Sequence, residues 1–214
     1  MEGVAIRSAR TSDAPFLAWT ILTAGRAHLG RGWYDIALGL PEEQCLYVLT
    51  RLVLARPHSW WRHSNFMIAE EDGQLAAALC AFGSTDGWGD SEAALAEAVA
   101  PLGWGEAELS QVWSRGSYVF TCTAPSAADL WTIENVATRP RSRGRGLAGH
   151  LLDQALERGR AEGFAAAQLS FVIGNRPAEW AYLKAGFIPV EEKRHPEFEA
   201  ATGSPGLKRF ERPL

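Results

Sequence analysis

The chain has 214 residues, of which 47% are hydrophobic and 21% charged, and its 25 acidic and 21 basic side chains give a formal net charge of −4. This composition is typical of one soluble globular domain that is long enough to form a full hydrophobic core. A weakly negative chain has no general basic field, which argues against nucleic acid and membrane surfaces as partners. The sequence therefore predicts a single domain over residues 1–214.

Cysteine, histidine and targeting signals exclude further classes of protein. Cys45, Cys80 and Cys122 are odd in number and widely spaced, which favours reduced thiols over a disulfide framework or a zinc site. The amino terminus lacks the basic start and apolar run of a signal peptide, and no apolar stretch reaches membrane-spanning length. We therefore expect a cytoplasmic protein. No metal is expected either, because metal-ligand spacing is missing among His28, His58, His63, His150 and His195.

The amino-terminal third predicts a strand, a helix start and a hairpin. Residues 4–9 have strand character, and residues 11–13 (Thr-Ser-Asp) are helix N-cap residues placed just before Pro15. Two apolar strands, 66–69 and 75–82, flank a Glu-Asp-Gly sequence, which predicts a hairpin with a slightly long turn.

Residues 83–129 are longer than a simple connection between two strands. They contain two predicted helices, 91–100 and 106–113, and a predicted strand at 117–123. We interpret the segment as an elaborated arm over the acceptor side of the sheet; a surface insertion unrelated to substrate is the alternative. Seven tryptophans precede residue 130, most of them predicted core residues and some of them candidates for an aromatic pocket: Trp19, Trp33, Trp60, Trp61, Trp88, Trp104 and Trp113.

Residues 130–138 carry the β-branched and aromatic side chains of a strand, which ends before Pro140. Strict alternation would place Glu134 on the same face as Val136 and Thr138, and Thr132 with them.

A helix over residues 146–162 follows, with one apolar stripe, and then an alternating strand over 167–173. Two strands joined by a helix of this length are expected to be parallel neighbours with a right-handed crossover. The intervening loop then lies at the carboxyl end of the first strand, where open α/β sheets bind ligands.

A short helix between residues 174 and 187 and a final strand complete the pattern. Pro177 suits the first turn of the short helix and Gly186 its carboxyl-terminal cap. A last strand at 207–212 is expected to pair with the one that begins at Phe187.

The loop from Arg143 to Ala148 combines small residues, a helix start and cationic side chains, which together suit an anion. Residues 144–149 spell the G-x-G-x-x-G of a dinucleotide-binding turn, but five residues separate them from the strand and no acidic residue ends the next strand. Four arginines within residues 139–145 could instead form a solvated or nucleic-acid-binding patch, which the overall charge does not support. The third interpretation, a compact site for a cofactor pyrophosphate, agrees best with the elements that follow.

These residues resemble the GNAT superfamily of acyl-CoA-dependent N-acyltransferases, closely over residues 131–190 and loosely elsewhere. In that family a Q/R-x-x-G-x-G/A loop holds the coenzyme A pyrophosphate, and Arg143, Gly146 and Ala148 occupy its positions. Arg141, Gly144 and Gly146 fit the same pattern two residues earlier. We prefer the later frame because it places Ala148 in the first helical turn.

A second family segment supports the resemblance. It has an Asn…Ala…Tyr…Gly-Phe pattern, matched here by Asn175, Ala178, Tyr182, Gly186 and Phe187. Both motifs occur at the expected spacing and on the expected elements.

The resemblance implies an α/β (α+β) fold: one GNAT-like mixed sheet flanked by helices, with a parallel β-α-β core that carries the pyrophosphate loop. It implies acetyl-CoA, or another acyl-CoA, as co-substrate and no metal. Asn175 would hydrogen-bond the pantetheine amides or would only cap the short helix. The implied cofactor-binding residues are Val136, Ala137, Thr138, Arg143, Gly144, Arg145, Gly146, Leu147, Ala148 and Asn175.

Acyl transfer to an amine needs a base, because an alkyl amine has a pKa near 10.4 in water. Glu134 is the candidate base, directly or through water; alternatively it pairs with a nearby arginine. Tyr182 is the candidate acid for the leaving thiolate, since phenol and thiol have pKa values near 10 and 8.5. The alternative for Tyr182 is a packed helix tyrosine.

The sequence thus predicts an N-acetyltransferase that acts on a primary amine of a small molecule or peptide, by direct attack in a ternary complex. The alternative is a regulatory or assembly module that binds acyl-CoA without turnover. We expect a monomer or homodimer, and the acceptor and preferred acyl chain length are left open.

Overall fold

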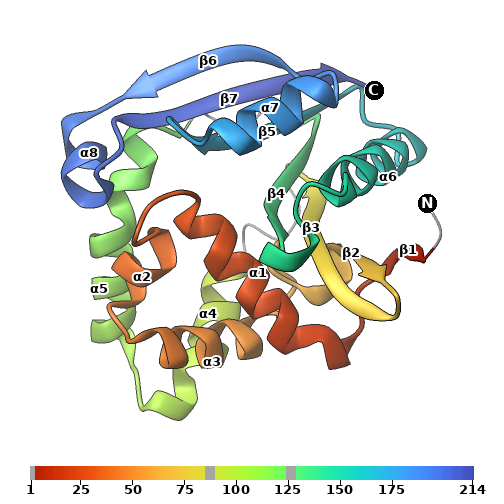
Figure 1. The fold of residues 1–214 in the computed structure, drawn as a ribbon. Helices are drawn as coiled ribbons and strands as arrows, with labels where there is room; N and C mark the ends of the chain where they lie inside the picture. The colour runs from red at the N-terminus through yellow and green to blue at the C-terminus, as the bar shows by residue number, and fades with distance from the viewer. Residues whose placement is uncertain (1–2, 85–89, 124–128) are drawn as a thin grey trace.

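The computed structural model describes residues 3–84, 90–123 and 129–214 (Figure 1). Within them seven strands form one mixed sheet in the order β1-β2-β3-β4-β5-β7-β6, with helices on both faces. This is the mixed, helix-flanked sheet that the sequence predicts. The strands are β1 (Val4–Ser8), β2 (Phe66–Glu71), β3 (Gln74–Gly83), β4 (Leu130–Thr138), β5 (Ala166–Val172), β6 (Ile188–Arg194) and β7 (Gly206–Pro213).

The helices include the predicted ones and three that the sequence did not predict. Three of them, α2, α3 and α8, have no counterpart in the sequence interpretation. The helices are α1 (Ala14–Arg26), α2 (Trp33–Leu38), α3 (Glu42–Leu52), α4 (Ser91–Val99), α5 (Glu106–Gly116), α6 (Leu147–Ala161), α7 (Arg176–Lys184) and α8 (Pro196–Thr202).

The β2–β3 hairpin closes more tightly than predicted. Its turn has only two residues, Asp72 and Gly73, whose φ angles are 51° and 73°. Positive φ at both central positions is the geometry that matches the right-handed twist of paired strands, and an Asp-Gly pair adopts it readily.

The predicted N-cap of the first helix also behaves differently. The Asp13 carboxylate accepts a hydrogen bond from the Arg10 backbone N–H at 2.7 Å and forms an ion pair with Arg7 at 2.7 Å. These contacts lock a 3₁₀ turn, Thr11–Asp13, ahead of α1, and no side-chain cap is made to α1 itself.

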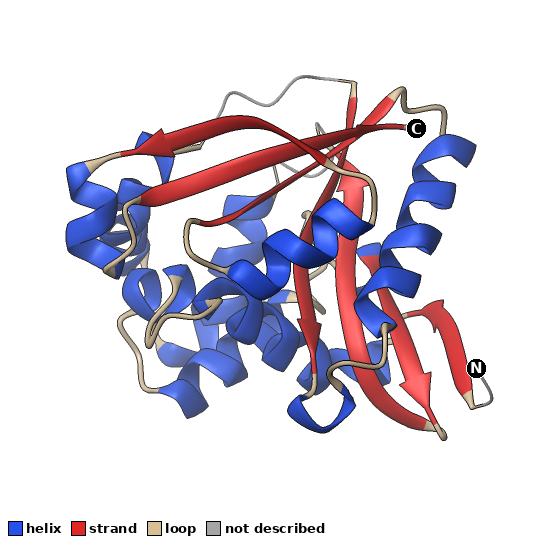
Figure 2. Cartoon of the chain, turned by 45° about the horizontal axis from the view of Figure 1, so that its top comes forward, coloured by secondary structure: helices blue, strands red, loops and turns tan. Residues whose placement is uncertain are grey.

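The parallel strands β4 and β5 pair over only part of their length, and this leaves a gap in the sheet. The two strands pair only over Leu130–Thr132 and residues 166–168, as predicted in direction but not in extent. Beyond Thr132 they diverge: in Figures 1 and 2 β4 runs down through the molecule, while β5 and β7 cross above it. The second half of β4 therefore has an edge that β5 does not cover.

A bulge in β4 corrects the predicted arrangement of its faces. Glu134 pairs with Cys80 and Ala137 with Ala78, so three residue steps on β4 match two on β3. Asn135 takes up the extra residue at a φ of 53°. Side chains before and after a bulge change faces. Glu134 consequently shares its face with Ala137, and Val136 and Thr138 lie on the other.

Helices pack on each face of the sheet around separate cores. On the Glu134 face, α1 and α3 bury residues such as Leu17 and Leu49 against Phe66. On the opposite face, α6 buries Leu151 and its neighbours mainly against β2, β3 and β4. Val136 packs with this second core, in agreement with the bulge.

The segment predicted as a strand at 117–123 is a 3₁₀ helix, η4 (Ser117–Thr121), that continues from α5. The Thr121 hydroxyl donates to the Tyr118 carbonyl at 2.6 Å, which satisfies backbone within the turn. Tyr118 is thereby directed against Phe198 of α8, with ring centroids 5.4 Å apart. The aromatic and β-branched residues that suggested a strand instead build a small third core with Cys122.

The tryptophans before residue 130 are largely core residues, as predicted. Trp61 is fully buried, and five others pack against the Glu134-face core at partial exposure: Trp19, Trp33, Trp60, Trp104 and Trp113. Trp88 lies outside the described residues. The three cysteines are free and buried.

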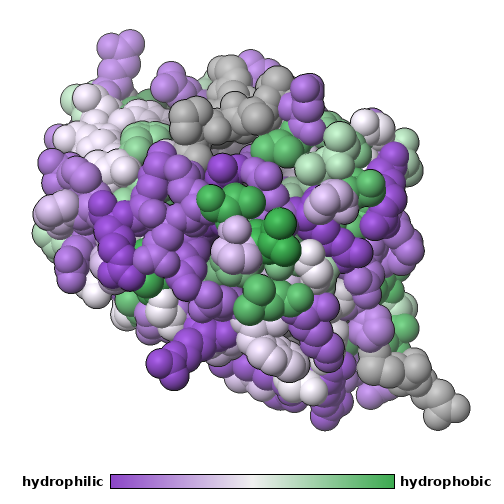
Figure 3. All heavy atoms as spheres, turned by 90° about the horizontal axis from the view of Figure 1, so that it is seen from above, coloured by the Kyte–Doolittle hydropathy of each residue, from purple (hydrophilic) through white to green (hydrophobic). Residues whose placement is uncertain are grey.

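One surface carries exposed apolar side chains. Figure 3 shows hydrophobic residues gathered on the face that includes the top of Figure 1, where β6 and β7 lie. The exposed large residues of β6 and of the neighbouring helix α7 are Trp180, Leu183, Ile188 and Val190. β6 is also an edge strand of the sheet.

Candidate active site

A cleft of about 990 Å³ lies where β4 and β5 diverge. One end is formed by the loop before α6 and the first turns of that helix. The middle is lined by residues 133–138 of β4, by the end of β5 and by α7. The other end is closed by the α1–α2 connection, η4 and α8.

The loop before α6 has the backbone of an anion site. Gly144 and Gly146 have φ angles of 77° and 79°, in the left-handed region that favours glycine. A Cβ on Gly144 would meet nothing within 4 Å, and one on Gly146 only His150 at 3.9 Å. Gly146 immediately precedes α6, whose first N–H groups have no intrahelical partner. The open space, the free donors and the helix dipole together favour a bound phosphate.

The four arginines of the loop have different positions, and only Arg143 lines the cleft. The Arg139 guanidinium lies over the rings of Phe16 and Trp19 at 5.0 and 4.9 Å. Arg141 donates to Gln74 at 2.5 Å, and Arg145 pairs with Glu71 at 2.7 Å.

This separation bears on the earlier interpretations of the loop. Three of the four cations are held against α1 or the β2–β3 hairpin, which does not suit a basic patch for nucleic acid. Arg141 faces away from the cleft, so the frame that begins at Arg143 is the one that directs its cation inward. The Arg145 side chain, a predicted cofactor contact, is engaged elsewhere, which leaves its backbone as its contribution to the loop.

Several predicted cofactor residues do come together along the cleft. Val136, Ala137 and Thr138 line it from β4, and Gly144, Gly146, Leu147 and Ala148 from the loop and α6. Asn175 lines it from the start of α7, where its Oδ1 also accepts a hydrogen bond from the Ala178 N–H at 3.4 Å. The capping role is therefore present, and the amide N–H₂ remains available to a ligand.

Asn135, at the bulge, adds an unsatisfied donor. Its Nδ2 is buried beside the cleft and has no hydrogen-bond partner in the described part of the chain. An orphaned buried donor is costly unless something accepts from it. No sequence pattern points to this residue, because its position depends on the bulge.

Glu134 lies on the floor of the open cleft, and its side chain is exposed to the cleft although protein atoms are packed around it. This desolvation raises the pKa of its carboxyl group to about 7. The residue forms no ion pair or hydrogen bond among the described residues, so the predicted alternative, a carboxylate that pairs with an arginine, is not realised there. The Tyr34 hydroxyl and the Cys80 thiol also face it: burial, and then the charge of Glu134, raises the pKa of each.

Tyr182 lies on α7 with its ring against Phe171, at a centroid distance of 5.4 Å, and it lines the same cleft. The two predicted roles of Tyr182 are compatible with each other. The residue is 7% exposed and its ring is packed, while its hydroxyl has no hydrogen-bond partner among the described residues. Burial raises the pKa of Tyr182, so the phenol keeps its proton at any working pH.

The far end of the cleft contains residues that the sequence did not identify as site residues. His28, Leu29 and Trp33 come from the α1–α2 connection and the start of α2, Tyr118 from η4 and Phe198 from α8. They are distant in sequence and lie on elements that have no motif, so only the fold brings them together.

The chain belongs to the GNAT acetyltransferase family, whose model matches residues 33–187. Solved structures agree at the level of the fold. An acetyltransferase structure is 19% identical with a TM-score of 0.68, and covers 98% of this chain and 99% of its own. An N-acetyltransferase from Staphylococcus aureus Mu50 is 20% identical with a TM-score of 0.65, at 97% and 100% coverage.

A third structure, yncA of Salmonella typhimurium with its cofactor acetyl-CoA, is 13% identical with a TM-score of 0.55, and covers 100% of this chain and 95% of its own. No curated protein matches the sequence.

The cleft fits the acyl-CoA co-substrate that the family uses. Its loop offers glycine space, free N–H groups and one inward-facing arginine, and the uncovered edge of β4 offers backbone donors and acceptors to an extended amide chain. In the described residues no group of three or more His, Cys, Asp or Glu side chains is arranged to hold a metal ion. Among the helices that the structure describes, none combines the length and apolar content that a bilayer crossing needs.

Proposed function

We propose that the protein is an N-acetyltransferase that transfers acetyl from acetyl-CoA to a primary amine, by direct attack while both substrates are bound. The observation that carries the proposal is the pair of unpartnered groups in one cleft: the Glu134 carboxylate on its floor and the Tyr182 hydroxyl on its wall. A binding module has no need to keep both groups free of protein partners.

Glu134 would accept the proton of the attacking amine. A carboxyl pKa of about 7 makes half of the groups carboxylates at neutral pH, and each is a stronger base than an ordinary glutamate. A base poised near the working pH is effective because it is both sufficiently deprotonated and sufficiently basic. When bound, acetyl-CoA supplies the thioester that the free amine attacks.

Tyr182 would donate a hydrogen bond or its proton to the departing sulfur. Ordinary pKa values near 10 for the phenol and 8.5 for the thiol make full proton transfer to the thiolate slightly unfavourable, and burial raises the pKa of the Tyr182 phenol further. The thiolate would leave within the same desolvated cleft, which raises its pKa in the same direction. The support for Tyr182 is therefore its position and free hydroxyl rather than an unusual acidity.

Arg143 and the N–H groups of residues 144–148 would hold the pyrophosphate, and the β4 edge with Asn175 would hold the pantetheine arm. These assignments rest on the lining of the cleft and on the motif frame. Held by these groups, acetyl-CoA would have its acyl group over β4, the strand that carries Glu134.

The direct experiment is to supply acetyl-CoA with a broad panel of primary amines and to follow release of free thiol. Turnover that depends on the amine supports an N-acetyltransferase. A protein that binds acetyl-CoA, by calorimetry, but acylates no member of the panel would instead be the regulatory or assembly module.

A further inference from the structure

The acceptor end of the cleft is built mostly from aromatic and aliphatic side chains, and the His28 ring also lines it. Trp33, Tyr118 and Phe198 surround it, with Leu29 and Val119 beside them. The Trp33 indole N–H is already used, because it donates to the Gly116 carbonyl at 2.9 Å. The indole therefore presents only its apolar surface to a ligand.

Apart from Glu134 and the His28 ring, the ionisable groups that line the cleft lie away from this end. Arg143, His150 and Asp153 belong to the loop and α6, and Lys184 lies at the end of α7, where it contacts the Trp180 ring at 5.2 Å. Figures 1 and 2 both place α6 and α8 on opposite sides of β4. Among the described residues, Glu134 is the only carboxylate that lines the acceptor half, and no arginine or lysine lines it.

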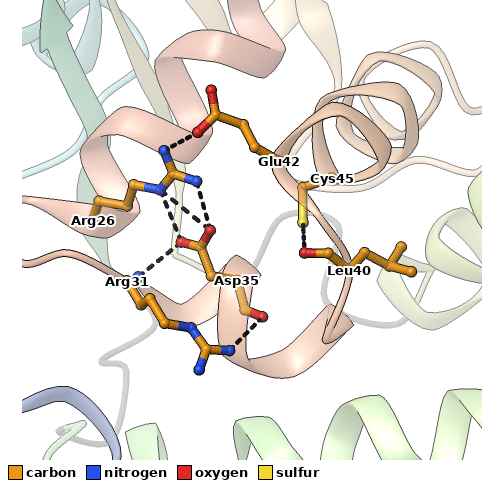
Figure 4. A network of polar contacts seen from close by, with 7 residues as sticks. Arg26, Arg31, Asp35, Leu40, Glu42 and Cys45 are labelled. Atoms are coloured by element: carbon orange, nitrogen blue, oxygen red, sulfur yellow. Dashed lines mark hydrogen bonds and ion pairs between the residues drawn. The ribbon is translucent and has the colours of Figure 1, made fainter.

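Nearby carboxylates are already engaged in ion pairs and hydrogen bonds (Figure 4). Arg26 lies between Asp35 and Glu42, with contacts of 2.7 and 2.6 Å, and the Gly32 N–H donates to Asp35 at 2.9 Å. This network fixes the start of α2, on which Trp33 lies, and uses the acidic groups that a second cation would need. Neither Asp35 nor Glu42 lines the cleft.

We infer that the acceptor is an apolar monoamine: one primary amine on an uncharged aromatic or branched aliphatic body, with no carboxylate and no second amine. The inference rests on the proposed function, because Glu134 is taken as the partner of the reacting nitrogen. A second ammonium on the substrate would be desolvated at this end without a second carboxylate, and a substrate carboxylate would be desolvated there without an arginine or lysine, which is unfavourable in both cases. An apolar body would instead bury against Trp33, Tyr118 and Phe198.

The test uses matched pairs of amines with the parent protein and acetyl-CoA, measured as kcat/KM from thiol release. 2-Phenylethylamine and phenylalanine differ by a carboxylate, and pentylamine and 1,5-diaminopentane differ by a second ammonium. We expect the first member of each pair to be better by about tenfold or more, because buried groups left unpaired discriminate strongly. 2-Phenylethylamine should also exceed ethylamine by about a hundredfold, through burial of its ring.

Introducing a negative charge at the acceptor end provides an independent test. Leu29→Asp adds a carboxylate to the acceptor end and should shift the preference toward 1,5-diaminopentane by about tenfold, whereas Leu29→Asn should retain the monoamine preference. Melting curves check that both variants are folded. If one is not, the matched amine pairs measured with the parent protein decide whether the acceptor is an apolar monoamine.

The possible results distinguish a failure of the apolar monoamine proposal from a failure of the proposed N-acetyltransferase activity. A parent that acetylates phenylalanine or the diamine as well as their partners would overturn the apolar monoamine and leave the N-acetyltransferase standing. A parent that binds acetyl-CoA and releases no thiol with any amine would overturn both.

Discussion

The sharpest prediction concerns Glu134→Gln and its pH dependence. The substitution keeps the shape of the side chain and removes a carboxyl group whose pKa is raised to about 7 by desolvation. If Glu134 is the base, parent kcat should rise about tenfold per pH unit below 7 and level off above it. The variant should show no inflection near 7.

The size of the effect follows from the protonation of the amine. An alkyl amine with a pKa of about 10.4 is neutral in only about one molecule in 2,500 at pH 7. A base within reach contributes about 10²–10⁴-fold. The Glu134→Gln deficit should therefore be about 10²–10⁴-fold at pH 7 and shrink by about tenfold per unit up to pH 9, as the amine loses its proton unaided.

The assay is thiol release at saturating amine from pH 6 to 10, with Asp153→Asn as the matched control. Asp153 also lines the cleft, on α6, so this control removes the same charge away from the acceptor end. A Glu134→Gln profile parallel to that of the parent at every pH would refute the assignment of the base. So would an inflection that Asp153→Asn abolishes.

Stability supplies a second readout for the same group. The carboxyl pKa is about 7 in the folded protein against an ordinary 4.5, so the unfolded chain loses this proton first as the pH rises. The contribution of Glu134 to stability is then fully present below about pH 4.5 and is lost by the time the pH passes 7. The melting temperature of Glu134→Gln relative to the parent should rise between these pH values and stay constant above them. The ionisable neighbours Tyr34 and Cys80 stay neutral in this window, because burial raises the pKa of each.

Three further predictions test the rest of the site. Tyr182→Phe keeps the ring packing and should lower kcat by about 10²–10⁴-fold with little change in acetyl-CoA affinity; near-parental turnover would leave water as the proton donor. Arg143→Ala and Gly146→Val should weaken coenzyme A binding measured by calorimetry, whereas Arg145→Ala, whose side chain pairs with Glu71, should leave it nearly unchanged; equal losses in both arginine variants would contradict the chosen frame. Acetyl-CoA at 100 times its dissociation constant should add about 2.7 kcal/mol to the free energy of unfolding and raise the melting temperature by roughly 5–10 °C, and a larger shift with NAD would revive the dinucleotide interpretation.

The elements around the loop were predictable because their signals are local. β4 begins and ends where its β-branched run and Pro140 indicate, and α6 follows the glycines and its apolar stripe. The prediction that Glu134 shares a face with Val136 and Thr138 was wrong because of the bulge. A bulge depends on how β3 and β4 align, and the alternation of residues within one strand does not record that alignment. Similarly, residues 117–121 have the composition of a strand but continue from α5 and pack against α8.

The four closely spaced arginines of the loop show how far the site itself can be predicted from the sequence. Their sequence spacing is nearly uniform, yet Phe16, Trp19, Gln74 and Glu71 hold three of them outside the cleft. Which cation faces the ligand is decided by partners more than 60 residues away. The acceptor end depends even more on tertiary structure, since its residues come from α2, η4 and α8.

The early end of the β4–β5 pairing makes the sheet a structure in two parts. β1–β4 and β5–β7–β6 are joined through three residue pairs, and the remaining edge of β4 has no strand beside it on that side in the described chain. An amide-bearing ligand laid along this edge would act as a substitute strand. It would slow amide hydrogen exchange on both sides of the divide and make the two half-sheets open as one cooperative unit. Cofactor loading would in this way complete the architecture of the protein as well as its chemistry.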